Sequence, residues 1–127
     1  MEVLRISVDG GGGSRSSCVA IELEGRPFAL GVPPLLVSQP TSCQAISFVE
    51  FPEEIRDTAP HPAPRRQFGT VLNGVAETET SDGEVRRLRP GSVVLLEDTH
   101  GRGHVTRIIE GPFRLMFVAL DDASPDG

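Results

Sequence analysis

Glycine and proline punctuate this chain and place the strongest constraint on how it can fold. The 127 residues include 14 glycines and 11 prolines, which are spread along the sequence rather than gathered in one segment. Such spacing favours many short strands joined by turns over long helices. No window carries an apolar stripe with helical spacing over three turns. The pattern therefore predicts an all-β protein, with at most one helical turn at residues 52–56.

Alternating apolar and polar residues mark the expected strands. The clearest turn is Ser81-Asp82-Gly83, because an Asp-Gly pair accepts the positive φ of a tight hairpin. Asn73-Gly74 and Pro90-Gly91 are further expected turns. The alternating or apolar runs lie at 4–8, 19–23, 28–32, 44–51, 68–72, 75–80, 84–88, 93–96, 105–109 and 113–120. Such a series of short strands is typical of a β-sandwich or a closed barrel.

Composition disfavours several classes of function. The net charge is −6, which disfavours binding to nucleic acid or to anionic lipid, because phosphate is bound by clustered cations. Every basic residue is arginine, so Schiff-base lysine chemistry is excluded. No apolar run approaches the roughly 20 residues of a membrane helix, and no secretory signal is indicated, so we expect a cytoplasmic protein. Cys18 and Cys43 show no CxxC spacing and are expected to be buried or half-buried thiols.

Two of the three histidines stand at opposite ends of one β-rich segment, His61 to His104. The segment opens with HPAPRRQ and closes with LLEDTHGRGH. Side chains alternate between the inside and the outside of a small barrel, so residues from separate strands can converge at its mouth. The segment therefore predicts a polar site built from both of its ends.

The stretch from His61 to Arg107 resembles the cupins, and a weaker likeness extends upstream. The first cupin motif reads G-x5-H-x-H-x3,4-E-x6-G. His61 takes its first histidine position, Ala63 the second, Gln67 the glutamate position and Gly74 the final glycine, whereas the opening glycine has no match. The HPAPRRQ string is similar to that of a sub-group of small bacterial cupins.

The second cupin motif, G-x5-P-x-G-x2-H-x3-N, is matched in part. Gly91, Gly101 and His104 take its two glycines and its histidine. The spacing between the glycines is longer than the pattern, the proline is missing and Ile108 replaces the asparagine. Both motifs are thus present and both are incomplete.

The resemblance implies a fold, a cofactor and an assembly. The fold would be an all-β double-stranded β-helix, or jelly-roll barrel, formed by one domain over residues 1–127, with the motifs at 61–108 and a frayed tail at 121–127. Cupins commonly hold a divalent transition metal, here iron, manganese, nickel or zinc, and His61, Gln67 and His104 are the implied ligands. Small cupins also commonly pair as homodimers through exchanged or edge-paired strands.

The implied metal site is depleted, because Ala63 and Gln67 replace two ligands. Two imidazoles and an amide leave the charge of a divalent metal uncompensated. Additional candidate donors are His100, Glu97 and Asp98, together with Glu77 and Glu79 if their strand faces inward. Structural roles stay open for each group: His61 in a surface loop, His104 as a core histidine, Gln67 as a buried hydrogen-bonding group, and the Glu97-Asp98 pair as a turn cap.

Three functions stay open at this point. The first is a metal-dependent oxygenase, isomerase or lyase that acts on a small organic molecule. The second is a metal-free barrel enzyme that guides cyclisation or isomerisation of a polyketide-like or terpenoid substrate, as in natural-product biosynthesis. The third is a non-catalytic barrel that binds a small molecule.

The residues expected to carry catalysis are His104, His61 and Glu97. Arg66, Val71 and Thr106 are expected to line the substrate pocket. Arg65 and Arg66 are neighbours in an extended segment, so one should point outward while the other reaches the mouth and binds a carboxylate.

Overall fold

The computed structural model describes residues 1–121, and in this part of the chain all regular structure is β. The strands are β1 (Glu2–Val8), β2 (Ser14–Ala20), β3 (Glu24–Arg26), β4 (Leu35–Val37), β5 (Cys43–Phe51), β6 (Gln67–Thr80), β7 (Val85–Leu88), β8 (Val93–Leu96) and β9 (His104–Leu120). None of the described residues forms a helix with the length and apolar character needed to cross a membrane. The all-β prediction is confirmed, whereas the expected tail lies outside the described residues except for Asp121.

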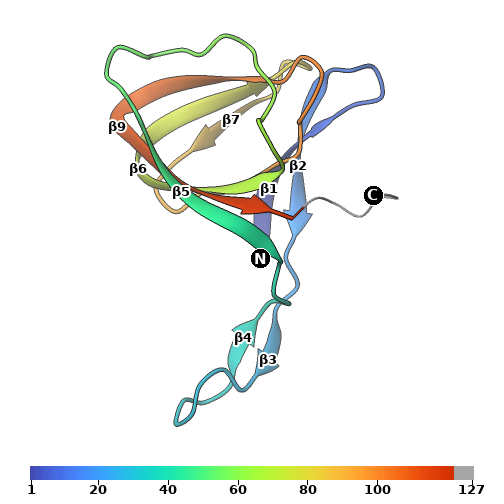
Figure 1. Cartoon of the computed structure of the whole chain (residues 1–127), viewed down its shortest axis with the longest axis vertical. Coiled ribbons are helices and arrows are strands. Elements are labelled where there is room, and N and C mark those ends of the chain that lie inside the picture. The colour runs from blue at the N-terminus through green and yellow to red at the C-terminus, as the bar shows by residue number, and fades with distance from the viewer. Residues whose placement is uncertain (122–127) are drawn as a thin grey trace.

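Within residues 1–121, seven strands form one mixed sheet in the order β2-β1-β8-β6-β9-β5, and β7 also pairs with β6. The β1–β8 pairing is parallel, and the other pairings in this sheet are antiparallel. The sheet curls around an interior in a barrel-like arrangement, whereas the small β3–β4 sheet projects away from it (Figure 1). We call the curled sheet and its loops the body, and residues 22–41 the arm.

The two longest strands, β6 and β9, form the spine of the body. They pair from Gln67↔Ala119 to Thr80↔His104, with register shifts near Asn73. The sequence predicts a break in each strand, at Asn73-Gly74 and before Phe113, and both predictions are wrong. The shifts absorb the turn-forming residues: Gly74 has a φ of 82°, and a Cβ there would lie 2.5 Å from the carbonyl oxygen of Pro112.

Other expected elements have mixed outcomes. The hairpin around Asp82-Gly83 is confirmed by the β6–β7 pairing, and the strand at 93–96 is confirmed as β8. Residues 28–32 form no strand, and residues 52–56 form a turn in which the Ile55 amide donates to the Pro52 carbonyl 3.0 Å away, rather than a helical turn.

The expectation of buried thiols is wrong. Cys18 and Cys43 are both free and exposed. Cys18 lies on β2 and Cys43 begins β5, and these are the two end strands of the main sheet order. A side chain on an edge strand has fewer neighbours to cover it, so the thiols meet solvent.

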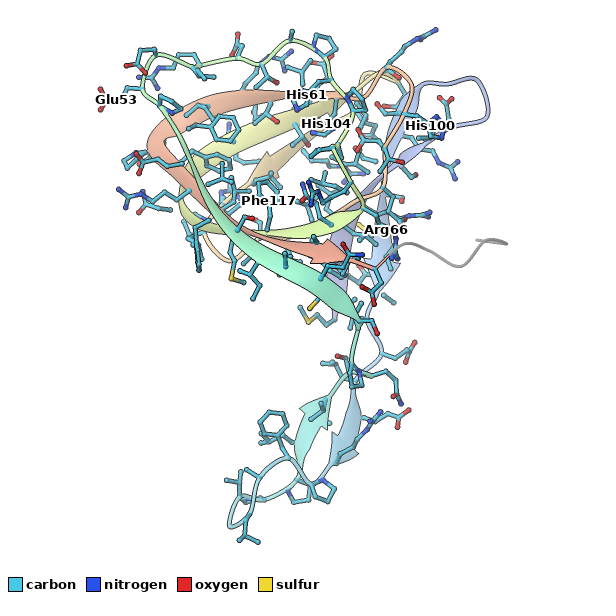
Figure 2. The ribbon with its side chains drawn as sticks, in the orientation of Figure 1. Glu53, His61, Arg66, His100, His104 and Phe117 are labelled. Atoms are coloured by element: carbon cyan, nitrogen blue, oxygen red, sulfur yellow. The ribbon has the colours of Figure 1, made fainter. Side chains whose placement is uncertain are left out.

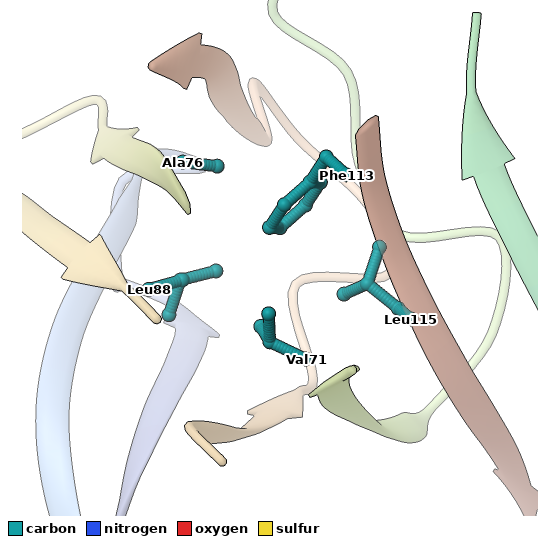
Figure 3. Close-up of a cluster of buried hydrophobic side chains, with 5 residues drawn as sticks. All are labelled: Val71, Ala76, Leu88, Phe113 and Leu115. Carbon is teal, nitrogen blue, oxygen red and sulfur yellow. The ribbon is translucent and has the colours of Figure 1, made fainter. Parts of the chain in front are cut away.

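Apolar side chains from opposite walls meet inside the curled sheet. One buried cluster joins Val71, Ala76, Leu88, Phe113 and Leu115 (Figure 3). A second joins Ile6, Ala63, Val94 and Leu96. Phe117 of β9 points into the interior and packs against both clusters (Figure 2). Burial of each large apolar side chain stabilises the fold by roughly 1.5–3 kcal/mol, so these clusters hold the walls of the interior in place.

Candidate functional site

The interior of the body contains a cavity of about 360 Å³. Most of its wall is apolar and comes from β5, β6, β7, β8 and β9. The polar part of its wall consists of Ser47, His61, Arg65, Gln67, Thr78, His104 and Thr106. An apolar cavity with a few convergent polar groups is the usual form of a small-molecule site.

His61 and His104 face each other across one backbone bridge at this cavity. The His61 amide donates to the His104 carbonyl at 3.1 Å, and the His104 amide donates back at 3.0 Å. Their ring centroids lie 5.1 Å apart, with the rings tilted by 44° (Figure 2). The structure therefore brings together the two ends of the His61–His104 segment.

Gly103 makes this close approach possible. Its φ is +73°, and a Cβ at this position would lie 2.0 Å from the carbonyl carbon and oxygen of His61. Only a residue without a side chain fits at that distance. A glycine is therefore required beside His104, because it lets the His61 segment pair with β9.

His104 is held by a buried carboxylate. Its Nδ1 lies 2.5 Å from Oδ2 of Asp98, and the exposed fractions of the two residues are 6% and 0%. In a neutral imidazole, an Nδ1 that donates to this carboxylate leaves Nε2 with its lone pair. The pairing therefore favours the tautomer that can accept a proton at Nε2.

His61 is arranged similarly, although with a weaker partner. Its Nδ1 lies 3.0 Å from the carbonyl oxygen of Ala59, which can only accept, so Nδ1 again donates. His61 is exposed, whereas His104 is buried. The two imidazoles therefore differ in surroundings: one sits at the mouth of the cavity and one within its wall.

The donor set for a metal is partial. Gln67 lines the cavity beside His61 and His104, as the motif predicts, and Ala63 lines it at the place of the missing histidine. Among the described residues, no aspartate or glutamate lines the cavity, and Asp98 instead contacts Nδ1 of His104. Within residues 1–121, no group of three or more histidine, cysteine, aspartate or glutamate side chains is placed to hold a metal ion. The residues present therefore lack the carboxylate of a 2-His-1-carboxylate centre.

Glu97, which is expected to take part in catalysis, is not among the residues that line the cavity. Its carboxylate accepts hydrogen bonds from Nε of Arg5 and Nε of Arg66, both at 2.5 Å. Partial burial opposes the charge of Glu97, but the hydrogen bonds from Arg66 and Arg5 outweigh it and lower the pKa of this carboxyl. A carboxylate held ionised by two guanidinium groups is poorly suited to carry protons.

Arg66 is therefore occupied, and Arg65 is the arginine that lines the cavity. Among the expected pocket residues, Thr106 lines the cavity, whereas Val71 belongs to the buried apolar core and is not part of the lining. Arg66 points away from the interior in Figure 2.

The remaining candidate donors also lie elsewhere. His100 is exposed in the turn before β9, away from His61 and His104 (Figure 2). Glu77 and Glu79 form ion pairs with Arg87 and Arg107 on the outer side of the sheet, while Thr78 between them lines the cavity. The hydrogen bond that Arg107 donates to Glu79 raises the pKa of the Arg107 guanidinium above its usual value.

Alternation along the chain could have decided between the neighbouring candidates, Glu97 or Asp98 and Arg65 or Arg66. Val94 and Leu96 line the cavity, so continuation of the same alternation beyond β8 selects Asp98 and not Glu97. Likewise Ala63 and Gln67 line it, and the odd-numbered position between them is Arg65. The signal was present in the sequence, but it needed the inward face of each strand to be known first.

No model of a known protein family matches this chain, and no curated protein matches it either. The class of the protein is therefore defined by its own geometry. It is an all-β protein whose curled sheet encloses a largely apolar cavity, and one histidine that lines this cavity is paired with a buried aspartate.

Proposed function

We propose that this protein is a small-molecule enzyme in which His104 transfers protons within an apolar cavity, without a metal. The observation that carries the proposal is the hydrogen bond between the buried Asp98 and Nδ1 of His104, in the wall of that cavity. A base oriented by a carboxylate and facing an enclosed site is the usual arrangement of general acid–base catalysis. The proposed reaction class is isomerisation, elimination or cyclisation of a largely apolar molecule.

The chemistry follows from the placement of the protons. Nε2 of His104 takes a proton from a carbon or hydroxyl of the substrate, and the electron pair left behind forms a double bond or displaces a leaving group. Asp98 stabilises the resulting imidazolium through Nδ1 and does not itself need to be protonated. His61, whose Nδ1 is held by the Ala59 carbonyl, is placed to exchange a second proton at the mouth. The low polarity of the wall strengthens each of these interactions.

We further propose that the fold is a cupin-like jelly-roll barrel. The support is that His61, Ala63, Gln67 and His104, which the cupin motifs align, all line one cavity in a curled antiparallel-rich sheet. Ala63 and Gln67, however, replace two of the usual metal ligands, and this favours the metal-free hypothesis over the metal-dependent one.

The experiment uses a probe reaction that any suitably placed base accelerates. In 5-nitrobenzisoxazole, removal of the proton on the ring carbon breaks the N–O bond and gives a nitrile and a coloured phenolate. We expect the protein, after treatment with EDTA, to accelerate this ring opening, and His104→Gln to lose the acceleration. His100→Gln is the matched control, because His100 is exposed in a turn. Equal rates in the wild type and in His104→Gln would overturn the proposal.

A bound divalent metal is the second candidate. It is favoured by the 5.1 Å separation of the two imidazole rings, and by Asp98, since metal-binding histidines commonly donate their other nitrogen to a carboxylate. His61, Gln67 and His104 would hold the ion, which would polarise a substrate oxygen. Metal analysis of protein purified without a histidine tag tests it: a stoichiometric metal whose removal abolishes activity would favour this candidate over the metal-free one. Tight binding of a metabolite without turnover would instead indicate a binding protein.

A further inference from the structure

We infer that the cavity takes a substrate with an apolar body and one anionic group, and that Arg65 binds the anion. The inference rests on the proposed function, because it takes the cavity to be the substrate site. Its starting point is the charge of the lining. Among the described residues that line the cavity, Arg65 is the one with a permanent charge, and no carboxylate is present to neutralise it.

The surroundings of Arg65 differ from those of most arginines in this chain. Arg5, Arg66 and Arg107, for example, each form an ion pair with a glutamate at 2.6 Å or less. Arg65 forms no ion pair with any residue in 1–121. It is exposed, so it lies at the rim of the cavity rather than in its depth. A planar guanidinium presents paired donors that match a carboxylate or phosphate.

The rest of the lining limits the size and character of the substrate. A volume of about 360 Å³ lies near the lower end of the range for small-molecule pockets. The depth of the pocket is formed by side chains such as Val94, Leu96, Phe113 and Phe117, which favour a hydrocarbon or aromatic body. Thr78 adds a buried hydroxyl that makes no hydrogen bond within the described residues. The combination suits a compact aromatic or cyclic carboxylate.

The test compares binding of 1-naphthoate with binding of 1-naphthamide, which has the same ring system without the charge. We expect the carboxylate to bind at least about tenfold more tightly, and Arg65→Gln to remove this preference while leaving the affinity for the amide unchanged. Arg89→Gln is the control, because Arg89 is exposed and does not line the cavity. Equal binding of the two probes by the wild type would overturn the inference.

A second variant separates this inference from the proposed catalysis. In His104→Gln we expect the preference for 1-naphthoate to persist, even though the ring-opening reaction is lost. If His104→Gln removes the preference and Arg65→Gln does not, the anion site is the imidazole, and the assignment to Arg65 is wrong. If both variants keep the preference for 1-naphthoate and His104→Gln keeps full ring-opening activity, the proposed function is wrong. The anion is then bound by a group other than Arg65.

A different observation supports an interaction surface. The β3–β4 arm projects from the body (Figure 1). Its apolar side chains are exposed, Leu36 by 71% and Leu30 by 104%. An isolated two-stranded hairpin is at best marginally stable in water. Both roots of the arm are nonetheless anchored, by hydrogen bonds from Ile21 to Met1 and from Asp121 to Ser42. The arm is thus held in place with an unburied apolar surface.

The body carries a matching surface on the outside of β5. Ile46 and Phe48 point away from the cavity and are exposed by 59% and 74%. Their register partners on β9, Val118 and Met116, are half-buried and extend the apolar face across the sheet. β5 is also the last strand of the sheet order, so one of its edges lacks a neighbouring strand within residues 1–121.

We propose that the arm of one copy docks on the outer face of β5 in a second copy, and the reverse. One chain carries both surfaces, so a two-fold axis buries two arms and two faces at once. An interface of standard size involves roughly 20–30 residues of each partner, which one arm and one β5 face together supply. A membrane is a poorer occupant, because the charged residues of the arm are Glu22, Glu24 and Arg26, and insertion into anionic lipid favours a cationic face.

The oligomeric state of matched variants tests this proposal. We expect light scattering after gel filtration to show a dimer for the wild type, and monomers for Leu36→Asp in the arm and for Phe48→Asp on β5. Val85→Asp, which changes another exposed apolar residue on β7, is expected to remain dimeric. Retained binding of 1-naphthoate shows that the variants are folded. A monomeric wild type that binds anionic vesicles, or dimers in both Leu36→Asp and Phe48→Asp, would overturn the proposal.

Discussion

Glu97 and Asp98 are adjacent in the sequence, but their carboxylates lie in opposite surroundings. Glu97 lies on the outer side and meets two guanidinium groups, whereas Asp98 is fully buried and meets one imidazole. Strand alternation decides between them, since Leu96 and Asp98 share the inward face after β8. The comparison teaches that position relative to the sheet, rather than residue type, turns one carboxylate into a surface anchor and the other into part of a candidate site.

The two carboxylates also differ in how strongly the stability of the protein depends on their partners. Arg5 and Arg66 are partly exposed, so their attraction to Glu97 is screened by water. Asp98 has no water contact, and its Oδ1 makes no hydrogen bond within the described residues. A buried carboxylate depends strongly on its partner, and removal of one member of such a pair is costly. Changes at Asp98 should therefore have larger effects than changes at Glu97.

The largest expected effect comes from Asp98→Asn. An amide can donate to Nδ1 as well as accept from it, so His104 can adopt the form whose Nε2 carries a proton and cannot act as a base. We expect the rate of 5-nitrobenzisoxazole ring opening to fall by about 10²–10⁴-fold. Glu97→Gln is the control and should keep the rate within a factor of about two. Equal losses in the two variants would remove the distinction between the carboxylates.

Gly103→Ala should be next in size, because it disturbs the backbone that holds the buried pair and leaves Glu97 untouched. The positive φ and the 2.0 Å approach to the His61 carbonyl both oppose a side chain. We expect the free energy of unfolding to fall by about 3 kcal/mol, measured by urea denaturation. Gly25→Ala, where a Cβ meets nothing within 4 Å, should change it little. Equal stability of the two variants would show that the close approach is not needed.

Glu97→Gln should have a smaller effect that depends on pH. The folded-state pKa of Glu97 is lowered below its ordinary value of 4.5, so its contribution to stability is present above that value and is lost as pH falls through the folded pKa. We expect a loss of about 1 kcal/mol at neutral pH. Urea denaturation at a series of acidic pH values should show the two proteins converging. A difference that grows with acidity would have the wrong sign.

The smallest expected effect is that of Glu50→Gln. Glu50 pairs with Arg114 at 2.6 Å, but both side chains are about half exposed. An ion pair in water contributes roughly 0–1 kcal/mol, less at high salt. We expect the change in unfolding free energy to be smaller than that of Glu97→Gln. Added salt should abolish this change. A larger loss than in Glu97→Gln would show that exposure does not rank these pairs.

Local patterns in the sequence predict where strands occur better than they predict how long the strands are. The Asp82-Gly83 hairpin follows from turn chemistry that acts over a few residues. The continuity of β6 through Asn73-Gly74 depends on Pro112, which lies far along the chain and accepts the Asn73 side-chain amide at 2.7 Å. A partner this distant cannot be recognised from a local turn signal, so the two breaks are predicted where register shifts occur.

The candidate site shows the same difference between what local patterns predict and what depends on the whole sheet. His61, Gln67 and His104, which the motif resemblance singles out, line one cavity. The choice between Arg65 and Arg66, or between Glu97 and Asp98, depends on which face of the strand turns inward. That face is set by the curl of the whole sheet, and neighbouring residues with the same charge look equivalent until the curl is known.

The parallel pairing of β1 with β8 has a consequence for how the chain acquires its structure. β1 joins the sheet at Leu4↔Val94, and Arg5 reaches Glu97 across 92 positions of sequence. Contacts of such long separation slow folding, because a large loop must close before they form. During synthesis, the first hairpin must therefore wait with one unpaired edge until β8 leaves the ribosome. Until then the apolar side chains of β1, such as Ile6 in the second buried cluster, have no partner from β8 to cover them.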